Sequence, residues 1–135
     1  MIATVGFTGT RHGMSTSQVV AVDDYLSNLA IQELHHGDCV GADHDADRIA
    51  AANGLKRIAH PPSDNRLRAY CDAEVVLEPK PYLDRNRDIV DACDHLIATP
   101  AETTPQTKGG TWYTVRYARD NGKPVTIIWP DGSIS

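Results

Sequence analysis

The sequence has no long hydrophobic run, no leader pattern and no excess of positive charge. No apolar stretch among its 135 residues approaches the roughly 20 that a membrane-spanning helix needs. The N-terminus leads into a β-rich run without the basic region and cleavage site of a secretory signal. A formal net charge of −5 at pH 7 argues against a groove for a polyanion. We therefore expect a cytoplasmic protein that binds neither a membrane nor a nucleic acid polymer.

Cysteine is also scarce. The sequence holds Cys39, Cys71 and Cys93, an odd number without CxxC spacing. This usage gives no disulfide framework and suits a reducing compartment, so we expect three free thiols. A chain of this length with 41% hydrophobic residues is long enough to bury a core without such staples. We expect a single domain over residues 1–135.

What the sequence does have is a regular alternation of short apolar strands and helices. Expected strands cover residues 3–8, 33–37, 56–60, 95–99 and 125–129. Helical patterns between them begin near Ser15, Ala42, Pro81 and Thr111. Residues 73–77 fit either a short strand or a helix turn. The alternation predicts a three-layer, Rossmann-like α/β domain with a mostly parallel five-stranded sheet in an order such as 3-2-1-4-5.

Glycines fall in each turn that such a sheet would place at its ligand crevice. An open parallel sheet binds its ligand beyond the carboxyl ends of the strands, where the strand order reverses. Candidate ligand-binding residues in the first two turns are Gly9, Thr10, Arg11, Gly37, Asp38 and Gly41. The coincidence favours a nucleotide-like ligand.

The stretch Gly109-Gly110-Thr111 supplies the third turn, directly before a helix. Adjacent glycines let the backbone approach a ligand closely, and Thr111 is expected to cap the helix. A helix start of this kind offers free N–H groups to an anion, most often a phosphate. Plain loop-and-cap geometry is the alternative. We include Thr114, one turn into the helix, among the candidate ligand-binding residues.

These motifs, taken in order, resemble those of the SLOG superfamily. The segments concerned are residues 6–11 (GFTGTR), 36–43 (HGDCVGAD), 84–98 (DRNRDIVDACDHLIA) and 109–115 (GGTWYTV). The superfamily joins Lonely-guy phosphoribohydrolases, the DNA-processing protein A family and small stand-alone nucleotide-binding domains. The resemblance covers nearly the whole chain. It implies a Rossmann-like fold, a nucleotide or nucleotide-derived ligand and often a homodimer.

Lonely-guy enzymes cleave the N-glycosidic bond of a nucleoside 5′-monophosphate with an arginine and a glutamate. The resemblance places Arg85 at the arginine position, but Thr114 stands where the glutamate belongs. A threonine hydroxyl stabilises an oxocarbenium-like sugar poorly. Nucleotide binding is therefore the leading prediction. An N-glycosidase is the alternative, with Arg85 polarising the substrate and Asp43, Asp84 or Glu102 replacing the glutamate.

The remaining candidates each have a structural explanation as well. Arg11 either pairs with phosphate or is a solvated loop arginine. Asp43 is expected to hold a ribose hydroxyl or to activate a water. The histidines and acids of residues 35–47 lack a known zinc spacing, so we expect neither a metal nor a cofactor.

Three apolar features complete the predictions. Trp112 and Cys93 lie on helix faces typical of core residues. Leu83, Ile89 and Val90 extend beyond one face of the helix from Pro81 to Cys93. With the family resemblance, this pattern suggests a homodimer.

Overall fold

The computed structural model of the chain describes residues 3–135. Its strands are β1 (Thr4–Gly9), β2 (Glu33–His36), β3 (Lys56–Ala59), β4 (Val75–Val76), β5 (His95–Thr99) and β6 (Val125–Ile127). Its α-helices are α1 (Thr16–Ser27), α2 (Ala42–Ala52), α3 (Tyr82–Ala92) and α4 (Gly110–Asp120), with a 3₁₀ turn at Asn65–Leu67. None of these helices is long and apolar enough to cross a membrane.

The strands form one parallel sheet in the order β4-β3-β2-β1-β5-β6. All the expected strands are present and in the expected order, which confirms the Rossmann-like α/β fold. The number of strands was wrong, because β4 adds a sixth at the edge. Val75 and Val76 form only a two-residue strand, with Val76 exposed, so the segment is too short to show a periodicity.

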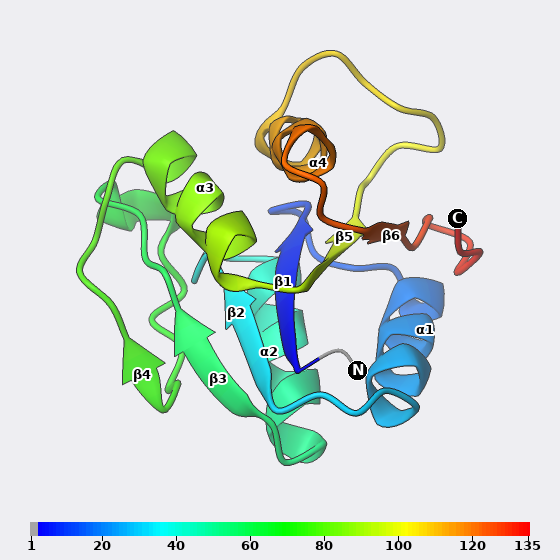
Figure 1. Cartoon of the computed structure of the whole chain (residues 1–135), viewed down its shortest axis with the longest axis horizontal. Coiled ribbons are helices and arrows are strands. Elements are labelled where there is room, and N and C mark those ends of the chain that lie inside the picture. Colours follow the sequence, from blue (N-terminus) through cyan, green and yellow to red (C-terminus); the bar gives the residue numbers. More distant parts are fainter. Residues whose placement is uncertain (1–2) are drawn as a thin grey trace.

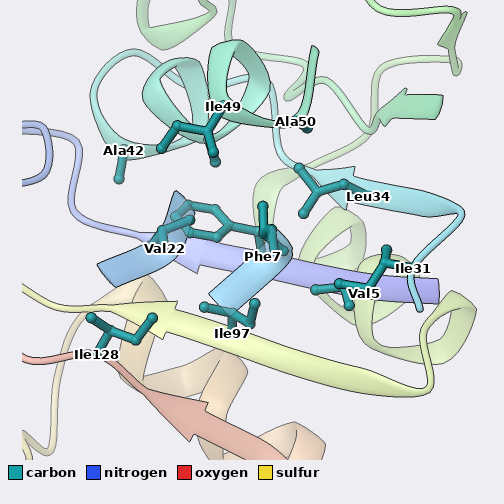
Figure 2. Packing of buried hydrophobic residues seen from close by; sticks show 12 residues of the cluster. Val5, Phe7, Val22, Ile31, Leu34, Ala42, Ile49, Ala50, Ile97 and Ile128 are labelled. Atoms are coloured by element: carbon teal, nitrogen blue, oxygen red, sulfur yellow. The ribbon is translucent and has the colours of Figure 1, made fainter. Parts of the chain in front are cut away.

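Helices cover both faces of this sheet (Figure 1). Side chains of β1 and β2 pack with α1 and α2 on one face, in a cluster that includes Phe7, Leu34 and Val22. Figure 2 shows Phe7 near the middle of that cluster. On the other face, α3 packs on β1 and β2, and α4 packs on β5 and β6. Trp112 of α4 is 4% exposed there. Trp112 and Cys93 are buried, as predicted, and all three cysteines are free.

The start of α4 differs from the expectation. Thr111 does not cap the helix, because the N-cap is Gly109 and the helix begins at Gly110. Gly109 has φ 102°, a backbone conformation that residues other than glycine rarely adopt. The left-handed backbone at Gly109 therefore fixes where the helix starts, and Thr111 lies within the first turn.

Candidate functional site

A cavity of about 550 Å³ lies at the carboxyl ends of β1 and β2, beside the starts of α2 and α4. The predicted site residues that line it are Gly9, Thr10, Arg11, Gly37, Asp43, Arg85, Gly109, Gly110 and Thr111. They come from segments far apart in the sequence. The sheet order brings them together, because β1 pairs with β2 on one side and with β5 on the other.

Asp38 was also predicted to bind ligand, but the structure places its carboxylate away from this cavity. It is fully buried and accepts hydrogen bonds from Arg68 Nε at 2.9 Å and from the Cys71 backbone N–H at 2.8 Å. Its backbone adopts φ 53°. The carboxylate thus holds the segment around residues 68–71 against the end of β2.

Gly41 and Thr114 lie outside the lining as well. Gly41 has φ 93°, and an added Cβ would collide with the backbone of Arg11. Thr114 is 1% exposed, and its hydroxyl donates to the Gly110 carbonyl at 2.7 Å. Gly41 therefore shapes the turn that carries Arg11, and the Thr114 hydroxyl is used within α4.

The first turn of α4 presents unused backbone donors to the cavity. The first hydrogen bond of the helix runs from the Tyr113 N–H to the Gly109 carbonyl at 3.0 Å. Within residues 3–135, the N–H groups of Gly110, Thr111 and Trp112 have no hydrogen-bond acceptor. Because these groups carry the positive end of the helix dipole, they form a ready site for an anion.

The starts of the other helices carry a side-chain cap or an acidic residue that the start of α4 lacks. Ser15 and Gln18 form a capping box on α1. Asp43 and Asp45 occupy the first turn of α2, and Asp84 that of α3. Of the helices described over residues 3–135, α4 alone begins with neither a side-chain cap nor an acidic residue. Its positive end is therefore free for a negatively charged ligand.

Arg85 is anchored at the wall of the cavity rather than free in it. It is 5% exposed, and its guanidinium donates to the carbonyls of Gly37 and of His60, the latter at 3.1 Å. Its Nε donates to Asn86 Oδ1 at 2.7 Å. These bonds tie α3 to the ends of β2 and β3 and give the charge a fixed place.

Asp43 lies in the first turn of α2 and lines the same cavity. Burial raises the pKa of this carboxyl, although the nearby His36 and Arg85 act in the opposite direction. One carboxylate oxygen accepts the Cys39 N–H at 3.2 Å. A carboxyl group with a raised pKa at a cavity wall is suited to transfer a proton.

The cavity also has lining residues that the sequence analysis did not select, notably Asn86, Tyr82 and Lys108. Lys108 directly precedes the glycine pair, and this position in the sequence could have identified it as a site residue. Nothing in the sequence identified Asn86 and Tyr82, because the helical pattern of α3 does not reveal which residues meet α4. Glu102 is one of the predicted substitutes for the missing glutamate. It lines the cavity too, and its carboxylate accepts Trp112 Nε1–H at 2.8 Å.

A second cluster, away from this cavity, has metal-ligand residue types. The ligand atoms of His36, Asp47 and Cys71 lie within 4.8 Å of one another. Both ring nitrogens of His36 are already used: Nδ1 accepts the Asp38 N–H at 2.9 Å, and Nε2 bonds Asp47 at 2.9 Å. The second oxygen of Asp47 pairs with Arg57 at 2.9 Å. The arrangement fits a buried hydrogen-bond network better than a metal site.

The fold of this chain is shared with known protein structures, although its sequence matches no protein-family model. A scan against protein-family models gave no match, and neither did a search of curated proteins. Solved structures do match. The molybdenum cofactor binding protein from Rippkaea orientalis superposes with a TM-score of 0.74 and 19% identity, over 96% of this chain and 77% of that one.

Two further structures share the fold. DNA processing protein A from Streptococcus pneumoniae gives a TM-score of 0.70 and 23% identity, over 93% of this chain but 50% of that one. The molybdenum cofactor carrier protein from Chlamydomonas reinhardtii gives a TM-score of 0.64 and 19% identity, over 94% of this chain and 76% of that one. These structures are all less than 25% identical to the chain, so what they share with it is the fold. DNA processing protein A belongs to one of the families that the motifs resemble, and its match is a match in fold.

Proposed function

We propose that the protein binds a nucleotide or a nucleotide-derived small ligand, with a phosphate at the Gly109-Gly110-Thr111 start of α4. The observation that carries this proposal is the open first turn of α4. Its first N–H groups, on residues that line the cavity, have no acceptor among residues 3–135, while each of the other helix starts described there has a side-chain cap or an acidic residue. An anion is the complement of such a site.

The rest of the cavity fits the same class of ligand. Its volume of about 550 Å³ falls within the range of roughly 300–1,000 Å³ typical of small-molecule sites. Arg11 and Lys108 add positive charge to the lining, and Tyr82, which is 53% exposed, offers an aromatic face. Two structures of this fold are named for a molybdenum cofactor, which supports a small ligand here.

Calorimetry against a panel of nucleoside 5′-monophosphates tests the proposal. The informative variant is Gly110→Asp, which sets a carboxylate beside the open N–H groups. The variant is expected to fold, because an added Cβ would meet only ordinary contacts at 3.6 and 3.8 Å. We expect its affinity to fall about tenfold to a hundredfold, the effect of losing one charge-assisted contact of about 1.5–3 kcal/mol.

Thr16→Asp is the matched control, because it adds the same charge in the exposed first turn of α1, outside the cavity lining. It should bind like the unmodified protein. If no member of the panel binds, or if Gly110→Asp binds as tightly as the control, the ligand site is not at α4.

An N-glycosidase acting on a free nucleoside 5′-monophosphate is the second candidate, favoured by Asp43. This buried carboxyl has a raised pKa and lines the same cavity as Arg85. In this reading Arg85 polarises the substrate and Asp43 transfers a proton or activates a water. Binding without turnover ranks first, because Thr114 holds the position of the family glutamate and lies buried within α4.

We also propose a homodimer in a reducing, cytoplasmic compartment. The three free thiols support the compartment. The dimer rests on the family resemblance and on the exposed start of α3.

A further inference from the structure

Asn86 is a buried amide at the wall of the proposed ligand cavity. It lies on α3, is 6% exposed and lines the cavity. Its Nδ2 would be 3.8 Å from a Cβ added to Gly110, so the amide reaches the first turn of α4 from the opposite helix.

The chemistry of Arg85 fixes which way this amide points. A guanidinium donates hydrogen bonds and accepts none, so the atom of Asn86 that lies 2.7 Å from Arg85 Nε must be the oxygen. Arg85 is itself held by the carbonyls of Gly37 and His60. The NH₂ group of Asn86 is therefore turned away from Arg85.

Among residues 3–135, that NH₂ group makes no hydrogen bond, since the one hydrogen bond of the Asn86 side chain goes through its oxygen. Although Asn86 is 6% exposed as a residue, its Nδ2 is not a sealed atom: in the described part of the chain only Thr99 Oγ1 is a side-chain polar atom both buried and unpaired. The NH₂ group is therefore open to the cavity and available to an acceptor on a ligand or a water. The N–H groups of Gly110 and Thr111 are unpaired on the facing side of the same cavity.

We infer that Asn86 Nδ2 donates a hydrogen bond to the phosphate that binds at the start of α4, and that Arg85 is its positioning residue. This inference rests on the proposed function and adds a specific contact to it. The phosphate would be held from two sides, by backbone N–H groups of α4 and by a side-chain amide of α3. Because the donors sit on two packed helices, they select a tetrahedral oxyanion at that point of the cavity.

The first experiment follows Asn86 directly in the unmodified protein. Side-chain and backbone amide resonances are recorded by NMR during titration with the tightest-binding 5′-monophosphate of the panel, and separately with inorganic phosphate. We expect the Asn86 side-chain resonances to shift together with the backbone amide of Thr111. A shift at Thr111 without one at Asn86 overturns the inference and leaves the proposed function standing. No shift at either residue contradicts both.

The second experiment compares two variants of Asn86 to test whether its amide donates to the ligand or only supports the structure. Asn86→Asp keeps an acceptor for Arg85 Nε but removes the donor and adds a negative charge. Asn86→Leu removes both, so the buried Arg85 Nε loses its partner. A ligand donor predicts that Asn86→Asp loses about tenfold or more in affinity for the nucleotide while its thermal unfolding stays near that of the unmodified protein.

A merely structural role predicts the reverse order. Asn86→Asp would then bind within about twofold of the unmodified protein, and only Asn86→Leu would lose affinity, together with stability. That result would refute the assignment of Asn86 as a ligand donor.

Discussion

The guanidinium of Arg85 occupies the space that a side chain at Gly37 would need. A Cβ built on Gly37 would lie 2.5 Å from Arg85 Nη1 and 2.9 Å from Asp43 Oδ2. Arg85 also donates to the carbonyl of Gly37 itself. A side chain at Gly37, directly after β2, would therefore force the guanidinium of Arg85 and the carboxylate of Asp43 to shift, and Arg85 holds the side chain of Asn86.

Gly37→Ala should destabilise the protein and weaken nucleotide binding together. The added methyl group has to displace Arg85, and overpacking of this kind typically costs about 1–3 kcal/mol. Urea unfolding and calorimetry on the same preparations measure the two effects. Gly110→Ala is a control for stability alone, because its Cβ has room and alanine suits a helix better than glycine, but the residue lies in the proposed phosphate site. A Gly37→Ala variant as stable as the unmodified protein would contradict the packing argument.

The unmodified protein should release base from ordinary nucleoside 5′-monophosphates only slowly. Loss of one electrostatic stabiliser of a developing charge typically lowers the rate by about 10²–10³, so trace turnover fits and about one turnover per second does not. Chromatography of a panel of 5′-monophosphates after incubation provides the measurement. Thr114→Glu should lower stability rather than restore activity, since Thr114 is buried.

Any trace release of base can be assigned with Arg85→Ala and Asp43→Asn. We expect both variants to abolish it. Brisk turnover that survives Arg85→Ala but not Asp43→Asn would make the enzyme the leading function. Brisk turnover that survives both would point to Glu102, whose carboxylate also lines the cavity.

His60 should make the protein less stable in mild acid. Burial, with a smaller effect from His35, lowers the pKa of His60 to about 4 from an ordinary 6.5. Between those values the unfolded chain binds a proton that the folded protein does not, so the free energy of unfolding falls as the pH falls. The full lowering of the His60 pKa corresponds to about 3 kcal/mol of the free energy of unfolding, which is lost as the pH falls from 6.5 to 4.

Denaturant unfolding at pH 7.0 and at several lower values down to about 4.5 checks this expectation. His60→Gln keeps a polar group beside His35 without a charge to gain in this range, so its stability should depend less on pH. An equally steep dependence in His60→Gln would assign the effect to other groups, among them His35, whose pKa burial also lowers.

The homodimer stays a prediction, and the structure limits which residues of α3 could form its interface. Ile89 and Val90 are buried within the protein's own core, so they cannot face a partner. Tyr82 remains exposed and Leu83 half-buried at the start of α3. Light scattering at micromolar concentration should give twice the monomer mass of 14.7 kDa. Tyr82→Asp should reduce this mass, whereas Val20→Asp on the exposed face of α1 should not. A mass of 14.7 kDa for the unmodified protein would refute the dimer.

The sequence by itself determined the α/β fold and the place of the cavity. Strand β5 has the predicted bounds, because every one of its residues is buried and the apolar run ends sharply at Pro100. The turns at Gly9, Gly37 and Gly109 were visible because glycine marks sites where the backbone bends or packs closely. In a parallel sheet those turns must meet at one edge, so local patterns sufficed.

The tertiary structure alone decided what each polar side chain does there. Asp38 and Arg85 are equally polar in the sequence, but one holds a loop from within the core and the other positions Asn86 beside α4. Thr114 was predicted to face the ligand, yet its hydroxyl bonds its own helix. Strand β4 exists only because Val75 and Val76 find a neighbour in β3. Such roles depend on partners distant in the chain, and no local pattern of residues records which partners folding will bring together.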